Sequence, residues 1–401
     1  MATEDVIKTY LKDTFENQNL SNCEVTVTGT NDQTEGFGSY ITFAVVSGTA
    51  KDGTTKNINT AIKISRENLL KKYRKAYERE AYIYSTVFPR FTTFQKENKV
   101  KNIFTSFPKC YRIISDEKLF VEIVILEDLK KRGYVLYDRK KPLDLDHLKL
   151  VLREYGNFHA ISFAFRHKKK EDFKKLVSNF DDVMIDIIDG SLAPMLRNTF
   201  QKVCGTLKEI DRPELYEICN DILVKGAGEA MKELLKVKEP QSAILHGDCW
   251  NNNFLYKYEQ TGTPTEVAIL DWQISRVHSP VVDLSYFMYS TSSKEQLQHF
   301  DELLEIYYNS FSTTVKELGC DPEELFSFSA LKDHWKKYSL YGVFMLVFSL
   351  HVILSDKEEL PSDFEGNEDG TDFSDVKITN RDEYIKRLVA VLSHYHKYSS
   401  T

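Results

Sequence analysis

The stretch that decides the fold is His246-Gly247-Asp248-Cys249-Trp250-Asn251-Asn252-Asn253, followed by Ile269-Leu270-Asp271-Trp272-Gln273. An apolar run stands before each acidic residue, at positions 243–245 and 267–270. Such runs are typical of buried strands that end in polar loops. A hairpin at Gly262-Thr263-Pro264 would join the two strands and bring their ends together. The stretch therefore predicts a polar site built from two strand ends.

Asp248 is the candidate for a group that takes a proton. A carboxylate in this place can orient a hydroxyl and accept its proton while a bond to phosphorus forms. The alternative is an ordinary turn in which the Asp248 side chain bonds the backbone at a strand end. His-Gly-Asp alone does not decide between the two.

Asn253 and Asp271 are candidate metal ligands. A hard cation such as Mg²⁺ prefers oxygen ligands and usually shares them with phosphates. One amide, one carboxylate and the triphosphate of ATP would complete such a site. A helix cap or turn is the alternative for Asp271, but both motifs in this order favour the metal site.

Lys63 is a charged residue in the middle of the apolar strand Thr60-Ala61-Ile62-Lys63-Ile64. A buried lysine is costly unless it is paired. We expect Glu80 on the following helix to pair with it and to aim it at nucleotide phosphates. The alternatives are an outward-facing lysine for Lys63 and a solvated helix face for Glu80.

Two segments are candidates for contacts with the rest of the nucleotide. The loop with Gly36, Gly38 and Ser39 lies between two predicted strands, and its backbone could close over phosphates or form a plain hairpin turn. Backbone groups of Glu127 and Leu129 could pair with the adenine edge, although a simple linker would have the same sequence.

Two further residues are assigned structural roles. We expect His246 to be part of the loop that carries Asp248 rather than a general base. Asp283 is expected to brace that loop through backbone N–H groups, or to cap a helix.

The sequence predicts an α+β protein of two lobes, residues 1–129 and 130–401. The first lobe would be a small antiparallel sheet with helices at 4–16 and 69–88, the second stopped by Pro89. Its strands are expected at 24–29, 40–48, 57–65, 109–115 and 119–126.

The second lobe is expected to be mainly helical, with 243–272 as its only strand-like region. Apolar spacing predicts a helix at 144–168, and others at about 171–237, 281–312, 321–355 and 381–398. The acidic segment 356–375 is expected to be a mobile surface loop.

Composition limits the partners. The chain has 401 residues, 42% hydrophobic and 28% charged, with a net charge of −7. This charge favours neither nucleic acid nor an anionic membrane as a partner, and nothing indicates an obligate protein partner. The six scattered cysteines indicate neither a zinc site nor a disulfide framework. With no apparent secretory signal, we expect a reduced, cytoplasmic setting.

The chain resembles the ecdysteroid kinase-like (CHK-kinase-like) family, which is related to aminoglycoside phosphotransferases and choline kinases. The two motifs quoted first carry the resemblance, together with Ser279-Pro280, Asp283-Leu284, Glu80-x3-Tyr84, Pro108-Lys109-Cys110-Tyr111, Leu126-Glu127-Asp128-Leu129 and Phe158-His159-Ala160. The family implies a bilobal protein-kinase-like fold, ATP with Mg²⁺, and phosphorylation of a hydroxyl on a small molecule. Matching positions imply Asp248 as catalytic base, Asn253 and Asp271 as metal ligands, and Lys63 with Glu80 as the phosphate-positioning pair.

The sequence departs from the family pattern at Cys249 and Trp272, which stand where an aliphatic residue and a phenylalanine are usual. Neither change removes a required group. The loop with Gly36 and Gly38 is poor in glycine, so its phosphate contacts are the weakest assignment. The short stretch between Asp271 and Pro280 leaves little room for an activation loop, which disfavours a protein substrate.

Three functions follow as hypotheses. The first is an ATP-dependent kinase for an ecdysteroid-type steroid or a lipophilic xenobiotic, held by aromatic residues of the second lobe. The second is a kinase for a cationic small molecule of the choline or amino-sugar type, attracted by the acidic segment. The third is a nucleotide-binding pseudokinase without turnover, which the complete set of polar groups disfavours.

Overall fold

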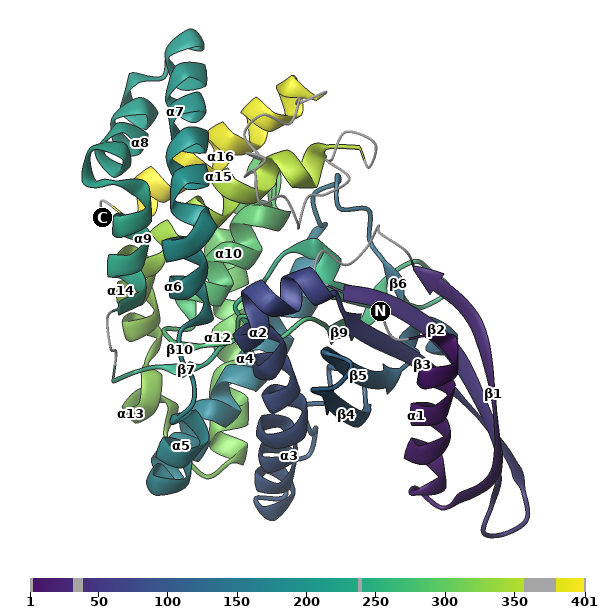
Figure 1. Ribbon diagram of the computed structural model, residues 1–401. Coiled ribbons are helices and arrows are strands. Elements are labelled where there is room, and N and C mark those ends of the chain that lie inside the picture. The colour runs from purple at the N-terminus through teal and green to yellow at the C-terminus, as the bar shows by residue number, and fades with distance from the viewer. Residues whose placement is uncertain (1–2, 32–38, 237–239, 357–379, 400–401) are drawn as a thin grey trace.

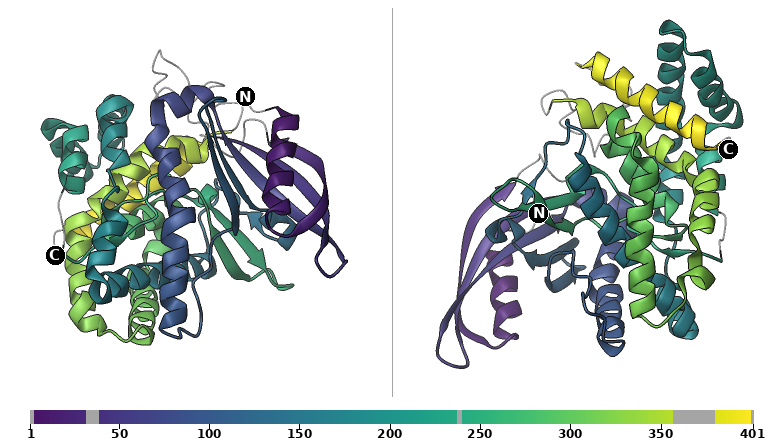
Figure 2. Two further views of the ribbon diagram at one scale, coloured as in Figure 1. Left: turned by 60° about the horizontal axis from the view of Figure 1, so that its bottom comes forward. Right: turned by 180° about the vertical axis from the view of Figure 1, so that it is seen from behind.

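The structure is a computed structural model that describes residues 3–31, 39–236, 240–356 and 380–399. Figure 1 shows a curved sheet on one side of the molecule and a larger group of helices on the other. The two further views in Figure 2 show the same division. The predicted α+β class, with a sheet lobe and a helical lobe, is confirmed.

Five antiparallel strands form the N-terminal sheet in the order β1-β2-β3-β5-β4. They are β1 (Leu20–Asn31), β2 (Ser39–Ala50), β3 (Thr55–Ser65), β4 (Cys110–Asp116) and β5 (Val121–Glu127). All five predicted strands exist, and most extend slightly beyond the predicted ends. Alternate residues of β2 and β3 are buried, which explains why a period of two was visible in the sequence.

The predicted amphipathic helix at residues 4–16 is α1 (Glu4–Glu16), capped by the side chain of Thr3. Its residues Leu11 and Phe15 are completely buried in a cluster with the sheet residues Val46 and Ile62. The helix covers one face of the sheet (Figure 1), so the sheet lobe has a hydrophobic core of its own.

The prediction that Pro89 stops the second helix is wrong. Helix α2 (Glu67–Tyr82) passes into the π-helical turn η1 (Ile83–Val87) and then into α3 (Phe88–Glu97). Pro89 lies in the first turn of α3, where the missing N–H of a proline costs least. The wide turn before it therefore lets the chain remain helical.

A linker connects the lobes through the 3-10 turn η2 (Leu129–Arg132) and the short strand β6 (Val135–Leu136). The predicted boundary after residue 129 falls inside η2 and stays a prediction.

The remaining part of the chain is mainly helical. Its helical elements are α4 (Leu145–Lys168), α5 (Lys170–Val177), α6 (Val183–Ile187), η3 (Ile188–Leu192), α7 (Ala193–Glu209), α8 (Pro213–Lys225), α9 (Ala227–Lys236), α10 (Val281–Thr291), α11 (Lys294–Leu297), α12 (Phe300–Glu317), α13 (Pro322–Phe326), α14 (Phe328–Tyr338), α15 (Leu340–Leu354) and α16 (Arg381–Ser399). Within the described residues no single helix is long and apolar enough to span a membrane. The segments Pro322–Tyr338 and Leu340–Leu354 reach that length and apolarity only when taken together, and the chain bends by 51° between them. Most of the predicted acidic segment 356–375 lies outside the described residues.

Short strands surround the motif region. β8 (Phe254–Tyr258) and β9 (Pro264–Ile269) form a hairpin at the predicted turn, and β6 pairs with β8. β7 (Ala243–Ile244), the strand before Asp248, pairs instead with β10 (Val277–His278). The prediction that the hairpin joins the strands before Asp248 and Asp271 is therefore wrong, because the 3-10 turn η4 (Asn251–Asn253) separates β7 from β8. The motif region is thus not the only strand-forming part of this lobe, because β6 and β10 lie outside it. Strands of two residues are too short to give a periodic pattern.

The helices α10 and α15 approach each other closely at Gly342. A Cβ atom added to Gly342 would lie 2.4 Å from the carbonyl oxygen of Ser285. Only glycine allows this contact without moving a backbone.

We expect Gly342→Ala to lower the free energy of unfolding by about 1–3 kcal/mol, the usual cost of overpacking. Denaturant unfolding followed by circular dichroism measures it. The matched control is Gly205→Ala in α7, where a Cβ would meet nothing within 4 Å. Alanine is the better helix former, so the control should be neutral or stabilising. Equal effects of the two substitutions would contradict the close contact.

Candidate active site

The loop between β7 and β8 carries Asp248 and owes its shape to Gly247. Gly247 has φ +92°, and a Cβ on it would lie 2.4 Å from the carbonyl oxygen of Ile274. A side chain would therefore be both strained and obstructed. Glycine at this position lets the loop turn sharply before Asp248.

Asp283 braces this loop from α10, as predicted. Its carboxylate accepts hydrogen bonds from the backbone N–H groups of His246 (2.7 Å) and Gly247 (2.9 Å). The ring of His159 contributes a third contact of 3.2 Å. Burial opposes ionisation, but His159 and the loop N–H groups outweigh it and lower the pKa of Asp283. The loop is thus held by a buried anion.

His246 connects the two motif loops. Its Nε2 lies 2.8 Å from the carbonyl oxygen of Leu270 and 3.1 Å from that of Asp271. Two carbonyl acceptors require a protonated Nε2, so Nδ1 accepts the hydroxyl of Tyr155 at 3.1 Å. Burial lowers the pKa of His246 and keeps the ring neutral. These contacts agree with the structural role expected from the sequence.

The carboxylate of Asp248 receives one hydrogen bond on each oxygen. Asn253 Nδ2 donates to Oδ2 at 2.7 Å, and the hydroxyl of Tyr286 donates to Oδ1 at 3.1 Å. Burial, reinforced by the negative charge of Asp271, raises the pKa of Asp248 to about 7. A proton acceptor with this pKa would be suited to work near neutral pH.

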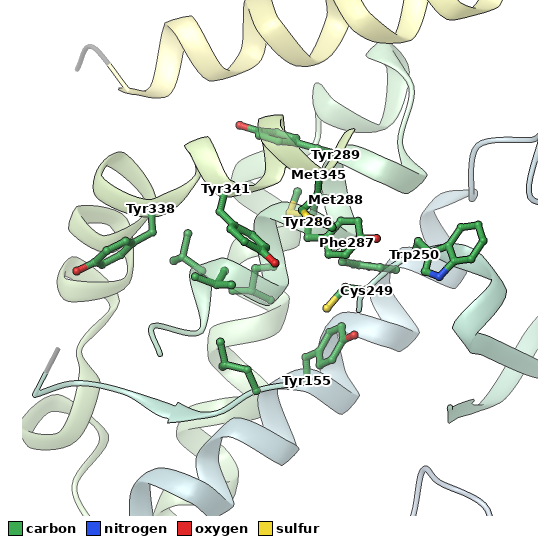
Figure 3. Packing of buried hydrophobic residues seen from close by; sticks show 14 of the residues in the cluster. Tyr155, Cys249, Trp250, Tyr286, Phe287, Met288, Tyr289, Tyr338, Tyr341 and Met345 are labelled. Carbon is green, nitrogen blue, oxygen red and sulfur yellow. The ribbon is translucent and has the colours of Figure 1, made fainter. Parts of the chain in front are cut away.

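Tyr286 was missed by the sequence analysis. It lies on α10 three residues after Asp283, so the two side chains share one helix face. That spacing could have indicated it once Asp283 was assigned to the loop. Figure 3 shows Tyr286 among buried side chains that include Cys249 from the Asp248 loop.

Asp271 follows β9 and adopts a left-handed backbone conformation, with φ +62°. Such a conformation costs a residue other than glycine about 1–2 kcal/mol, although aspartate tolerates it better than most. The fully buried Trp272 anchors the turn, with its ring packed against Phe88 (4.9 Å) and Phe158 (5.0 Å). The tryptophan thus fixes the backbone beside Asp271.

Lys63 and Glu80 form the expected ion pair. Lys63 Nζ lies 2.8 Å from Glu80 Oε2 and 3.0 Å from Asp271 Oδ1. Burial disfavours the charged amine, but the two carboxylates outweigh burial and raise the pKa of Lys63. Lys63 comes from β3, Glu80 from α2 and Asp271 from beyond β9, so one ammonium joins the two lobes.

The remaining predicted nucleotide contacts are placed as follows. Gly36 and Gly38 lie outside the described residues, whereas Ser39 is the buried first residue of β2. The carboxylate of Glu127 pairs with Arg132 at 3.1 Å. Leu129 is buried, and its carbonyl oxygen accepts the N–H of Tyr134 at 3.1 Å. None of these observations tests a contact with a nucleotide, so the roles stay predictions.

The oxygen donors near Asp248 are an amide and a carboxylate, which are the ligand types that Mg²⁺ prefers. Among the described residues, no group of three or more His, Cys, Asp or Glu side chains is arranged to hold a metal. Mg²⁺ needs fewer, because it usually takes one or two protein carboxylates together with phosphates and water. Asn253 uses Nδ2 for its bonds to Asp248, which leaves its amide oxygen for a cation. With the Asp271 carboxylate, this donor set fits Mg²⁺.

The sheet lobe, the helical lobe and the Lys63–Glu80 pair together define the protein-kinase-like fold that the sequence predicted. Within that class, the chain belongs to the ecdysteroid kinase-like family, whose model matches residues 33–320. The predicted family is therefore confirmed.

Individual similar proteins were also found. The 4-hydroxytryptamine kinase of Psilocybe cyanescens is 24% identical over 186 residues, 44% of this chain and 46% of that relative. The match thus spans about half of the relative's length. Two GDP complexes of aminoglycoside 2'-phosphotransferase-IIIa, a point mutant and the wild type, have TM-scores of 0.43 and 0.42 and identities of 13% and 12%. They cover 96% and 97% of this chain and 97% and 99% of their own chains.

The raised pKa of Asp248 predicts a pH-dependent cost in stability. The pKa of about 7 in the folded protein lies above the ordinary aspartate pKa of 3.8, so folding favours the protonated form. The cost is absent below about pH 4 and fully present above about pH 7. We expect Asp248→Asn to raise the melting temperature at pH 8, and to have little effect at pH 4. Three pKa units set an upper limit of about 4 kcal/mol.

Thermal unfolding without Mg²⁺ and nucleotide, measured from pH 4 to pH 8, checks this expectation. The control is Asp333→Asn on an exposed position of α14, which should show no such trend. A stabilisation by Asp248→Asn that does not change with pH would disprove the electrostatic origin.

Proposed function

We propose that this protein is an ATP-dependent phosphotransferase that phosphorylates a hydroxyl group of a small molecule. Family membership supports this class of enzyme. The observation that carries the proposal is the linked cluster in which Lys63 contacts Glu80 and Asp271, and Asp248 is held by Asn253. Each group that phosphoryl transfer requires has a counterpart in this cluster.

The proposed chemistry assigns one task to each side chain. Asp248 orients the hydroxyl of the acceptor and takes its proton as the acceptor oxygen attacks the terminal phosphorus of ATP; the bond from that phosphorus to the bridging oxygen breaks, and ADP leaves. Asn253 and Asp271 would hold Mg²⁺, which would neutralise charge on the phosphate oxygens. Lys63, positioned by Glu80, binds phosphate oxygens of the nucleotide. Little covalent work remains for the protein, so catalysis rests on orientation and electrostatics.

The acceptor we propose first is an ecdysteroid-type steroid or a lipophilic xenobiotic. The name of the family supports a steroid. Two aromatic residues belong to the surroundings of Asp248: Trp250 follows it by two residues in the same loop, and the hydroxyl of Tyr286 donates to its carboxylate. Apolar aromatic surroundings of this kind suit a flat apolar molecule that carries a hydroxyl group.

A cationic acceptor is the second candidate. It is favoured by the relative named 4-hydroxytryptamine kinase, because a hydroxytryptamine combines an aromatic hydroxyl with an amine.

We also propose a cytoplasmic location, since all six cysteines are free, as is usual in a reducing compartment.

The decisive experiment combines an acceptor panel with Asp248→Asn. The purified protein is incubated with labelled ATP, Mg²⁺ and an ecdysteroid, a plant phenol, 4-hydroxytryptamine, choline or an aminoglycoside. We expect transfer to at least one acceptor. Asp248→Asn should reduce kcat by about 10²–10⁴-fold, because the proton acceptor is lost, while ATP with Mg²⁺ still raises the melting temperature. Wild-type turnover by this variant would refute the role of Asp248, and nucleotide binding with no transfer to any acceptor would favour the pseudokinase.

Asp271→Ala tests the proposed metal site. We expect it to weaken ADP binding at least about tenfold in the presence of Mg²⁺, with a much smaller effect in EDTA, because only the metal-linked part of the affinity is removed. Isothermal titration calorimetry measures both conditions, and Asp333→Ala is the exposed control. The proposal fails if the variant retains the full Mg²⁺ dependence of the wild type.

A further inference from the structure

A cavity of about 850 Å³ lies beside the linker that joins the two lobes, and residues of that linker line it. Its walls come from the ends of β4 and β5, the linker, α3, α4 and β9. Figure 1 shows α3, β4, β5 and β9 meeting between the sheet and the helices. The side chains that line the cavity do not include Lys63, Asp248, Asn253 or Asp271. Glu127 and Leu129, whose backbone groups are predicted to contact the adenine edge, also line it, so the cavity borders these predicted nucleotide contacts without reaching the Lys63 cluster. Its size suits a small organic molecule.

The polar wall of this cavity has one carboxylate that forms no ion pair within the described part of the chain. Glu154 on α4 accepts a hydrogen bond from Ser106 Oγ at 2.6 Å, and the side chain of Asn157 and the charge of Arg153 also favour its ionised form. The other two glutamates of the wall do have cationic partners, since Glu127 pairs with Arg132 and Glu266 with Lys257. Burial raises the pKa of Glu154. An ammonium placed beside Glu154 would favour its ionised form.

The basic residues of the wall are already engaged. Arg132 is held by Glu127 at 3.1 Å, and Lys109 Nζ lies 4.8 Å from the centre of the Tyr111 ring. Neither residue therefore needs an anionic ligand to neutralise its charge. An anion is therefore not the ligand that this wall selects.

The apolar wall is aromatic. Phe88 and Phe107 stack with their ring centres 3.8 Å apart, and both line the cavity. Tyr84 also lines it, is 5% exposed, and has a buried hydroxyl oxygen without a hydrogen-bond partner among the described residues. An unsatisfied buried hydroxyl is costly, so the environment of Tyr84 is sensitive to what packs against its ring.

We propose that the cavity is a second binding site, that its ligand is a small protonated alkylamine that carries an aromatic ring and pairs with Glu154, and that the ligand acts as an effector of nucleotide binding. The site goes beyond the proposed phosphotransfer, since Lys63, Asp248, Asn253 and Asp271 do not line it.

Two routes connect the cavity to the Lys63 cluster. Tyr84 follows Glu80 by one turn of helix, inside η1, and the charges of Glu80 and Asp271 both act on its hydroxyl. On the other side, the carbonyl oxygen of Ser106 accepts the N–H of Ile269 at 2.8 Å, two residues before Asp271. A ligand that contacts Tyr84 and Ser106 would therefore favour one arrangement of both carboxylates. Coupling between two sites is reciprocal and typically amounts to about 5–150-fold in affinity.

The test uses the full-length chain and 2-phenylethylamine as the probe, with 2-phenylethanol as its uncharged match. Calorimetry should detect binding of the amine at millimolar concentration or below, and at least tenfold weaker binding of the alcohol. Glu154→Gln, which keeps the hydrogen bond to Ser106, should weaken amine binding at least tenfold. The control Glu305→Gln, at an exposed position of α12, should leave it unchanged.

Coupling is measured with ADP and Mg²⁺. Saturating amine should change the affinity for ADP by at least threefold in either direction, and Tyr84→Phe should reduce that factor toward one. No binding at millimolar amine would overturn the proposal, as would binding that is insensitive to Glu154→Gln. Loss of amine binding in Asp248→Asn would place the amine in the active site as an acceptor and also overturn it. Because these readouts need no turnover, failure of this site and failure of the proposed phosphotransfer remain distinguishable.

Discussion

The ammonium group of Lys63 is the interaction on which the arrangement of the two lobes depends. It contacts carboxylates from α2 and from the turn after β9, 2.8 Å and 3.0 Å away. Glu80 is almost completely buried, and a buried carboxylate without its cation would be strongly destabilising. The Lys63 ammonium group thus links the sheet and helix of one lobe to the turn after β9 in the other lobe. Of the groups proposed to meet the nucleotide, Lys63 and Asp271 are positioned directly by this contact.

Much of the site could be predicted because its chemistry leaves marks in the sequence. A lysine in an apolar strand needs an anion, and Glu80 was the natural candidate on the next helix. Asp283 was predicted to brace the loop, and the structure shows its carboxylate bonded to the N–H groups of His246 and Gly247. The five strands of the sheet were visible because one side of β2 and β3 is buried and the other is not.

The errors have physical reasons as well. Pro89 was expected to end a helix, but a π-helical turn places it where its missing N–H does no harm. Strands β6 and β10 have two residues each, which is too short for the alternation of apolar and polar residues that indicates a strand in a sequence. Tyr286 was missed because its partner, Asp248, is distant in the chain. Its hydroxyl bond to that carboxylate exists only once α10 is packed against the loop.

The close approach of α10 and α15 has a consequence for motion. At Gly342 the two helices meet with backbone nearly against backbone, so α10 has little room to shift against α15. Asp283 and Tyr286, which hold the loop of Asp248, stand on this closely packed helix. If the two lobes move relative to each other when a substrate binds, we expect the sheet lobe to move about the linker while the α10–α15 pair stays in place.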